Sequence, residues 1–524
     1  MFPCHSRGAR PQRKHSAPRH PARVGLDVRC RLLPMALIGI LALAARPAPA
    51  ETLAEASARL AARYAGQLEE LAAWCETNDL ADEAEITRGW PLPRAPLTLV
   101  VPLVGSEVDA PREGDQDPPA KAAEWRKRFT KLRKEQGSAL FALAVRAAGE
   151  KQGTLAYRLV YATLREDLSH QAARKLLGYK LHDGRWLTAY EVQKAQGNQV
   201  WHDQFGWLPR TQVERYEAGQ RYYKRRWIKA AEEAKLRADI KHGWDIVTEH
   251  YQVSTNHSLE EGVRLAARLE RLQQVWRQLF VRFYLSDEQI GRIFKGGVLP
   301  KSTKRHLVIC FRSRDEYVRA LIGGPHIGIT NGYYDIDLRS TYFFAGGEGD
   351  EQDDSNLYHE ATHQLFVESR PTSPKIGHAA NFWIVEGIAC YMESLTVGRG
   401  PLGDRFGTLG GAGQIRLKNA RARLLNEDFY FYVPLAELTR LGRDALQRDE
   451  RIKQLYGQAS GLTYFLIHGA DGRYRDALVD YLVTVYTAHD TPTTLAELTE
   501  RCYSELDREY REFLQGAEEA AGGR

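Results

Sequence analysis

The chain has 524 residues and an ordinary composition, 43% hydrophobic and 27% charged, which allows two or three domains with sizeable cores. Its formal net charge is +6, but nine of its 73 Lys and Arg residues and one of its 67 acidic residues lie in the first 50 positions. The other 64 basic and 66 acidic residues nearly balance, so the charge gives no reason to expect a nucleic-acid partner.

Residues 1–50 have the pattern of an export signal. Basic residues flank the apolar run Met35 to Ala45, and Ala48-Pro49-Ala50 follows as an A-x-A cleavage site. A run of 11 residues is short for a bilayer span, which needs about 20, so a permanent anchor is the weaker alternative. We therefore expect an exported protein of the periplasm, cell envelope or medium, with no stable membrane span after the signal is removed.

Residues 51–177 are expected to be mainly helical. Apolar residues recur at three or four positions in Thr52–Cys75, Trp125–Ala147 and Gly153–Leu177. Between them, Asp109–Ala120 is rich in proline and acidic residues, which predicts a loop.

Residues 178–239 contain a weak repeat of about 20 residues. Each copy predicts a short strand that carries a tryptophan and runs into a helix, and Thr188–Glu191 and Thr211–Glu214 have the form of capping boxes. The tryptophans either pack the units against each other or form an aromatic surface for an envelope protein or glycan partner. They are Trp186, Trp207 and Trp227.

Residues 240–516 mix strands and helices, which predicts an α+β domain with a small mixed sheet and a helical C-terminal part. The Gly-rich stretch Gly398–Gly413 is interpreted as a mobile rim, and residues 517–524 as a disordered tail. The expected strands are Trp244–Ser254, His306–Phe311, Gly328–Tyr333 and Leu338–Phe344, and the expected helices include Ser258–Tyr284, Asp315–Leu321, Leu462–Ile467, Ala477–Tyr486 and Leu495–Leu514.

The strongest signal is His359-Glu360-Ala361-Thr362-His363, an H-E-x-x-H pattern. Residues four apart lie on one face of a helix, so the two imidazoles can bind one zinc ion, while Glu360 beside it can act as the base for an attacking water. A second helix near Asn381 offers Glu386 as the third ligand. His378 is the rival third ligand, and Cys390 is interpreted as a packed core thiol.

These residues resemble the gluzincin metallopeptidases, in which H-E-x-x-H on one helix is completed by a glutamate on the next. Trp383-x-x-Glu386-Gly387-x-Ala389 is similar to the W-x-x-E-G-x-A form of that second helix in the aminopeptidase-like branch. The 22 residues between His363 and Glu386 exceed the usual 18. Residues 240–513 are also similar to peptidase-MA-like domains of unknown function in exported bacterial proteins, especially of planctomycetes.

The resemblance implies one zinc ion per chain held by His359, His363 and Glu386, with Glu360 as the catalytic base. It further implies that Tyr456 stabilises the oxyanion. For the strand Leu338–Phe344 it implies an edge that pairs with substrate; the alternative is a buried hairpin strand.

The implied function is hydrolysis of peptide bonds in a peptide or protein substrate. No G-x-M-E-N-like segment precedes the H-E-x-x-H helix, so endopeptidase action is expected rather than N-terminal trimming. The alternatives are a catalytically inactive envelope binding or scaffold protein and an accidental motif on a metal-free helix.

Overall fold

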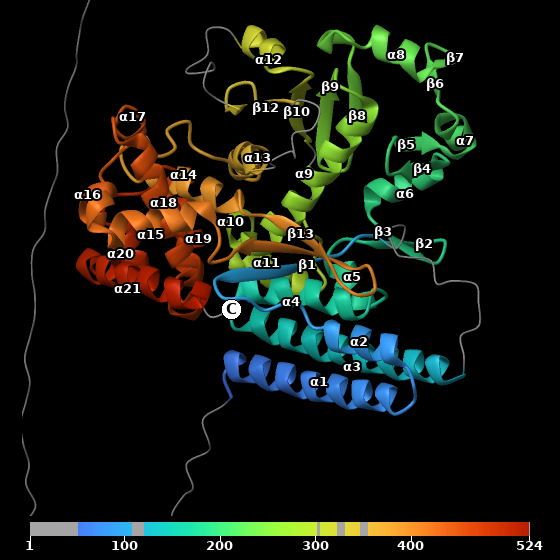
Figure 1. The fold of residues 1–524 in the computed structure, drawn as a ribbon, viewed down its shortest axis with the longest axis horizontal. Coiled ribbons are helices and arrows are strands. Elements are labelled where there is room, and N and C mark those ends of the chain that lie inside the picture. Colours follow the sequence, from blue (N-terminus) through green and yellow to red (C-terminus); the bar gives the residue numbers. More distant parts are fainter. Residues whose placement is uncertain (1–50, 107–119, 301–303, 322–330, 346–354, 523–524) are drawn as a thin grey trace, which may run out of the picture. The chain divides into compact units, whose positions relative to one another are not determined.

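The computed structural model describes residues 51–106, 120–300, 304–321, 331–345 and 355–522 (Figure 1). Helices and strands are mixed in an α+β arrangement with several small sheets, as the sequence predicted. No helix in the described ranges is long and apolar enough to cross a lipid bilayer. The predicted leader, residues 1–50, and residues 109–119 of the predicted loop lie outside the described residues.

The N-terminal region is helical because its apolar residues recur on one face of each helix. α1 begins at a capping box, in which the Thr52 hydroxyl accepts a hydrogen bond from the Glu55 N–H. The predicted helix Gly153–Leu177 is two helices, since the chain turns to an extended conformation at Asp167. The elements are α1 (Leu53–Glu76), α2 (Ala81–Gly89), α3 (Ala120–Gly149), α4 (Gly153–Glu166) and α5 (Gln171–Leu176).

A buried polar network joins this region to the C-terminal half. The Glu166 carboxylate accepts hydrogen bonds from the Tyr64 hydroxyl at 2.8 Å and the Trp90 indole N–H at 2.9 Å. Arg165 Nε donates to Asp404 Oδ2 at 2.7 Å. Because an unpaired buried charge is costly, the network fixes the helices against the segment that carries Asp404.

A three-stranded antiparallel sheet makes a second connection. β1 (Thr98–Leu103) pairs with β14 (Arg405–Gly410), which pairs with β13 (Thr396–Arg399). Two side-chain amides close the outer edge of β1, where Gln274 bonds to the Val104 backbone and Gln278 to the Pro102 carbonyl. The Gly-rich stretch interpreted as a mobile rim therefore contains a paired hairpin.

The tryptophan repeat forms three ββα units. Each has a hairpin before its helix, so the sequence missed the first strand of each unit. Only the first predicted capping box forms, at Thr188; the helix after Thr211 has no side-chain cap. The units are β2 (Lys180–His182), β3 (Arg185–Leu187) and α6 (Ala189–Gln196); β4 (Gln199–His202), β5 (Gly206–Pro209) and α7 (Val213–Glu217); and β6 (Gln220–Tyr223), β7 (Arg226–Lys229) and α8 (Ala230–Leu236).

Aromatic contacts link successive units. Tyr190 of the first unit meets Trp207 of the second edge to face, with ring centroids 5.9 Å apart, and Tyr216 of the second meets Trp227 of the third at 6.0 Å. Trp186 is buried. The tryptophans thus pack the units together, as in the first of the two interpretations.

A five-stranded mixed sheet has the order β11-β12-β10-β9-β8, in which β10 is parallel to β9 and β12 and the outer pairs are antiparallel. The prediction of Leu338–Phe344 as the substrate edge is wrong, because β12 is paired on both sides and buried, as in the hairpin alternative. The edge strand next to β12 is β11, and β8 is the edge strand on the other side. The bounds are β8 (Trp244–Val247), β9 (Tyr251–Thr255), β10 (His306–Phe311), β11 (Gly332–Asp335) and β12 (Ser340–Phe344).

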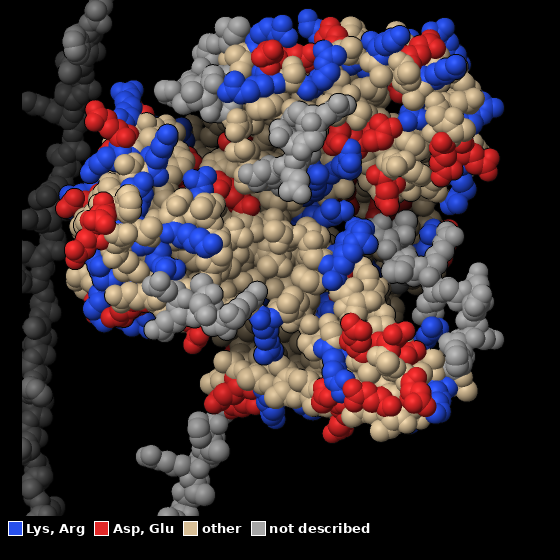
Figure 2. Space-filling model, viewed as in Figure 1, with Lys and Arg blue, Asp and Glu red and all other residues tan. Residues whose placement is uncertain are grey.

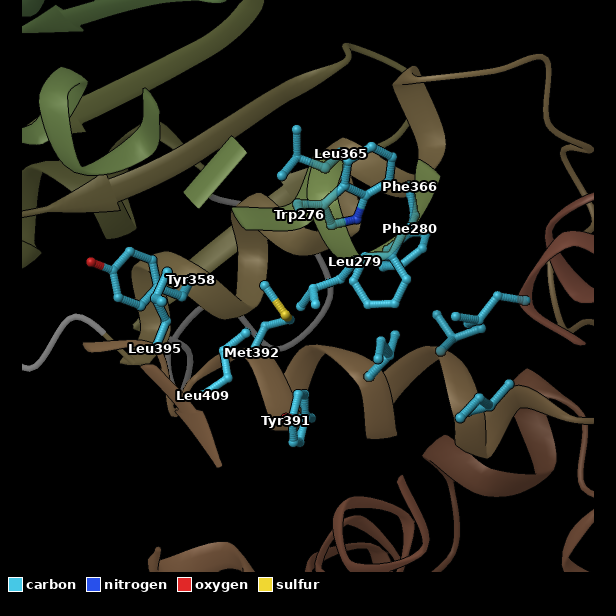
Figure 3. Close-up of a cluster of buried hydrophobic side chains, with 14 of the residues drawn as sticks. Trp276, Leu279, Phe280, Tyr358, Leu365, Phe366, Tyr391, Met392, Leu395 and Leu409 are labelled. Atoms are coloured by element: carbon cyan, nitrogen blue, oxygen red, sulfur yellow. The ribbon is translucent and has the colours of Figure 1, made fainter. Parts of the chain in front are cut away.

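Helices pack around this sheet and continue to the C-terminus. Phe366 of α13 lies against Trp276 and Phe280 at the end of α9, with ring centroids 5.2 and 5.0 Å apart (Figure 3). α21 runs to Gly522 and so includes most of the segment predicted as a disordered tail. The helices are α9 (Leu259–Leu279), α10 (Val281–Tyr284), α11 (Asp287–Phe294), α12 (Arg314–Ala320), α13 (Ser355–Glu368), α14 (Phe382–Met392), α15 (Ile415–Leu425), α16 (Leu435–Leu438), α17 (Arg443–Gln447), α18 (Ile452–His468), α19 (Arg475–Tyr486), α20 (Thr494–Thr499) and α21 (Tyr503–Gly522).

The close packing of α14 on α18 depends on Gly387. A Cβ at this position would lie 2.6 Å from Thr463 Oγ1 and 2.7 Å from the Ala459 carbonyl oxygen, both on α18. We expect Gly387→Ala to lower the free energy of unfolding by about 1–3 kcal/mol, the usual cost of overpacking. Gly66→Ala is the control, because position 66 of α1 is exposed, nothing lies within 4 Å of a Cβ built there, and alanine is the better helix former. Urea titrations that find Gly387→Ala as stable as wild type would contradict this packing.

Candidate metal centre

α13 presents His359 and His363 on one face. Its other face is buried in the core through residues that include Leu357, Leu365 and Phe366, which fixes the rotation of the helix. The two imidazoles are one turn apart, and their Nε2 atoms lie 3.2 Å from each other. The spacing of the H-E-x-x-H pattern therefore brings both nitrogens to one point.

α14 is placed by the residue before it. Asn381 has left-handed backbone angles, φ 56° and ψ 19°, which asparagine tolerates better than most residues. Its buried side chain accepts a hydrogen bond from the Tyr481 hydroxyl at 2.6 Å and donates to Asp490 at 2.7 Å. These bonds set the start of the helix, and Glu386 follows in its second turn.

The Glu386 carboxylate completes a group of three ligand atoms. Its Oε2 lies 3.4 Å from His359 Nε2 and 3.7 Å from His363 Nε2. Ligands bound at about 2.0–2.1 Å in tetrahedral geometry lie about 3.3–3.4 Å apart, close to all three separations. Two imidazole nitrogens and one carboxylate oxygen are also a donor set that zinc takes. The residues thus fit a zinc ion by geometry and by chemistry.

The electrostatics of the group favour a bound cation. Burial acts to raise the pKa of Glu386, but His363 and His359 outweigh it and hold that pKa well below its usual range. For His359, burial acts to lower the pKa, while hydrogen bonds to Cys390, Glu386 and Glu393 raise it well above normal. A buried carboxylate therefore stays ionised beside the imidazoles, as a metal ligand must.

Behind His359 lies a pair of residues that the sequence analysis missed. Glu393 Oε1 accepts a hydrogen bond from His359 Nδ1 at 2.9 Å, which leaves Nε2 for the metal. Arg416 of α15 binds both oxygens of Glu393 at 2.8 Å. Glu393 lies two helical turns after Glu386, so both side chains lie on one face of the segment. This spacing in the sequence could have predicted that Glu393 lies near the metal centre.

Glu360 contacts the edge of the five-stranded sheet. Its Oε2 accepts a hydrogen bond from the Tyr334 N–H of β11 at 3.1 Å. The close approach favours glycine at position 332, because a Cβ there would lie 2.9 Å from Glu360 Cγ, which would have to shift. The edge strand thus contacts Glu360 directly, a contact that the sequence did not predict.

Tyr456 projects from α18 toward the same group. Burial raises the pKa of its hydroxyl well above normal, and the nearby charges of Glu386 and Glu360 add to the effect. The phenol therefore stays protonated and can donate a hydrogen bond. The structure brings Tyr456, Glu360 and the three predicted ligands together.

The two other predicted candidates are not part of this group of three ligand atoms. His378 is exposed and belongs to no group of metal-binding side chains among the described residues. Cys390 is buried and forms a second group with His359 and Glu393. Burial raises the pKa of its thiol, which therefore stays neutral, as expected of a packed thiol.

Comparison with known proteins matches part of the chain to a protein family. The family model described as "Protein of unknown function (DUF1570)" matches residues 354–492. No curated protein and no solved structure matches the chain. The matched range encloses α13, α14, α15 and α18, and with them every residue of the candidate centre except those of β11.

If Arg416 holds Glu393 in place, its loss should weaken metal binding. We expect Arg416→Met to lower zinc affinity about 10–100-fold, the usual effect of removing a partner behind a ligand, while thermal stability stays near wild type. Lys418→Met, on the exposed side of the same helix, is the control. The measurement is competition with a chromogenic chelator, and equal affinities for the two variants would show that Arg416 is only structural.

Proposed function

We propose that this protein is an exported zinc metallopeptidase of the gluzincin type, which hydrolyses internal peptide bonds of a peptide or protein substrate. The observation that carries the proposal is the convergence of His359, His363 and Glu386 at tetrahedral ligand spacing. Glu360 and Tyr456 border the same point. The match to a family of unknown function is compatible with this proposal and assigns no activity.

The roles of the residues follow from their positions. A zinc ion bound by His359, His363 and Glu386 would lower the pKa of a water molecule and polarise the scissile carbonyl. Glu360 accepts the proton of the attacking water and delivers it to the leaving amine. Before substrate binds, the Tyr334 N–H holds the Glu360 carboxylate at the sheet edge.

Charge that develops on the carbonyl oxygen needs a hydrogen-bond donor. Tyr456 is suited to this role, because its high pKa keeps the phenol protonated beside Glu386. Glu393 and Arg416 are positioning residues that touch no reacting atom. Glu393 orients the ring of His359, and Arg416 holds Glu393.

Tyr456→Phe tests the assigned donor. The substitution removes one hydroxyl with little change in volume, so the protein should fold and bind zinc as before. Turnover of a cleaved peptide should fall about 10²–10³-fold, the usual cost of one lost oxyanion donor. Tyr430→Phe, at an exposed position, should leave turnover unchanged. Equal kcat values for wild type and Tyr456→Phe would show that the Tyr456 hydroxyl does not stabilise the oxyanion.

Glu360→Gln tests the mechanism. It preserves size and all three proposed ligands and removes only the carboxylate that takes the proton of water. Zinc content and thermal stability should stay near wild type. Turnover of an unbiased peptide pool should fall about 10²–10⁴-fold. Exposed Glu427→Gln is the control.

Three other outcomes are informative. Full activity of Glu360→Gln would refute the role of Glu360 as base, even if the three zinc ligands are assigned correctly. Loss of zinc in this variant would show that Glu360 is itself a zinc ligand or holds a zinc ligand in place. Stoichiometric zinc without activity in the wild-type protein would favour the scaffold alternative.

A further inference from the structure

The third ββα unit of the tryptophan repeat has a strained turn. Register pairs Tyr223 with Arg226, so the β6–β7 hairpin has a two-residue loop, Lys224-Arg225. Both loop residues have positive φ, 44° and 68°, which is the mark of a type I′ turn. Such a turn favours Asn-Gly or Asp-Gly, because most other side chains are strained there. The third unit therefore keeps two cations at positions where the backbone favours other residues.

The same hairpin has a buried inner face and an exposed outer face. Arg221 and Ile228 are buried on the inner face, where Arg221 binds Glu260 of α9 at 2.8 Å. Because side chains alternate along a strand, Tyr222 and Trp227 lie on the outer face. They are directly opposite each other, with ring centroids 5.2 Å apart, and Tyr222 is 42% exposed. The outer face thus presents an aromatic pair to solvent.

Exposed cations surround this aromatic pair. The guanidinium of Arg215 lies over the Trp227 ring, 4.7 Å from its centroid. Lys229 is on the outer face two residues after Trp227, about 7 Å along the strand, and the Lys224-Arg225 turn lies beyond Tyr222 at the other end. In Figure 2, Lys and Arg side chains lie over the region where Figure 1 labels β6, β7 and α8. A ligand on this face meets positive charge at both ends of the aromatic pair.

The cations of this face are poorly neutralised. Among the residues that the structure describes, Arg215, Arg225 and Lys229 form no ion pair. Arg226 and Glu232 are 3.7 Å apart, but both side chains are exposed, and an exposed pair of this kind contributes little. The positive charge of the face is therefore available to an anionic ligand.

The first unit of the repeat shows that packing does not require these residues. Its hairpin has the same loop length, with Asp183-Gly184 in place of Lys224-Arg225. Counted from the turn, Leu181 takes the place of Tyr222. A ββα unit therefore forms without the basic turn and without the exposed ring, so both are free to serve binding in the third unit.

We propose that the outer face of the β6–β7 hairpin binds a linear anionic polysaccharide whose sugars carry carboxylates. The ligand must offer negative charge to the cations and a flat C–H face to the rings, and a uronic acid sugar offers both in one repeating unit. An acidic polypeptide offers the charge without the flat face. The inference goes beyond the proposed peptidase function and does not depend on it. The face consists of Arg215, Tyr222, Lys224, Arg225, Trp227 and Lys229.

Two other anionic partners fit the face less well. Nucleic-acid binding depends on many phosphate contacts, whereas residues 51–524 carry 64 basic and 66 acidic residues and provide no general excess of positive charge. Membrane surfaces are bound by apolar side chains that enter the lipid interface. Here Trp227 is half-buried under Arg215, so the face has little apolar area to insert.

The first test compares two polymers that have the same backbone. Polygalacturonate carries one carboxylate on each sugar, and its methyl ester carries none. Binding of the purified protein to each immobilised polymer is measured by biolayer interferometry. Polygalacturonate should bind at least about tenfold more tightly at low salt, and the difference should shrink as salt is raised. Equal binding of the two polymers would overturn the proposal.

Replacement of the strained turn separates folding from binding. Lys224→Asn with Arg225→Gly introduces the pair that this turn prefers, so the variant should be at least as stable in urea as wild type. It should bind polygalacturonate about tenfold more weakly, since two cations are lost. Arg126→Gln with Lys127→Gln, at exposed positions of α3, removes the same charge and should keep wild-type affinity. Equal affinities of the two double variants would overturn the site.

Tyr222→Ala tests whether the rings take part. Loss of the stacking surface should weaken polygalacturonate binding about three- to tenfold, while Tyr430→Ala, at another exposed position, should leave it unchanged. An affinity for polyglutamate as high as that for polygalacturonate would show that charge alone is recognised and would overturn the polysaccharide. Binding of single-stranded DNA or anionic vesicles, but not of polygalacturonate, would overturn it as well.

Discussion

The structure depends on one buried carboxylate, Glu386, which must stay ionised between two imidazoles. Removing that charge from water is costly, and the cost is met only while His359 and His363 remain within 3.4 and 3.7 Å of its oxygen. Much of the C-terminal architecture serves this requirement. α13 fixes the imidazoles through its buried face, and Asn381 sets the start of α14. α18 presses against Gly387 and brings Tyr456 to the same place.

The N-terminal region is part of this support. β1 pairs with the hairpin that leaves α14, and α9 closes the outer edge of β1 with two glutamines. Arg165 holds the turn of the same hairpin through Asp404. Residues far away in sequence therefore hold the segment between Glu393 and Arg416 in place. This fixes the positions of the two side chains that orient His359, since Glu393 precedes the segment and Arg416 follows it.

Local patterns were predictable from the sequence, and long-range ones were not. The H-E-x-x-H spacing is a property of one helix, so both imidazoles and Glu360 were found without knowledge of the fold. Glu386 followed from its helix and from the resemblance to gluzincins. Arg416 was missed because its contact with Glu393 depends on how α15 packs, and β1 because its partner is about 300 residues away. The sequence left open whether Leu338–Phe344 is an edge strand or a buried strand, since both β11 and β12 have strand composition and only the pairing order distinguishes them.

We expect His359, His363 and Glu386 to bind one zinc ion. Zinc-edge X-ray absorption of the purified protein, together with its metal content, measures this binding. The expected result is one zinc per chain with nitrogen and oxygen ligands at about 2.0–2.2 Å and no sulfur ligand. A chain that binds no zinc after loading would contradict it. A sulfur ligand at about 2.3 Å would also contradict it, because the ion would then be bound by Cys390 in the second group of side chains.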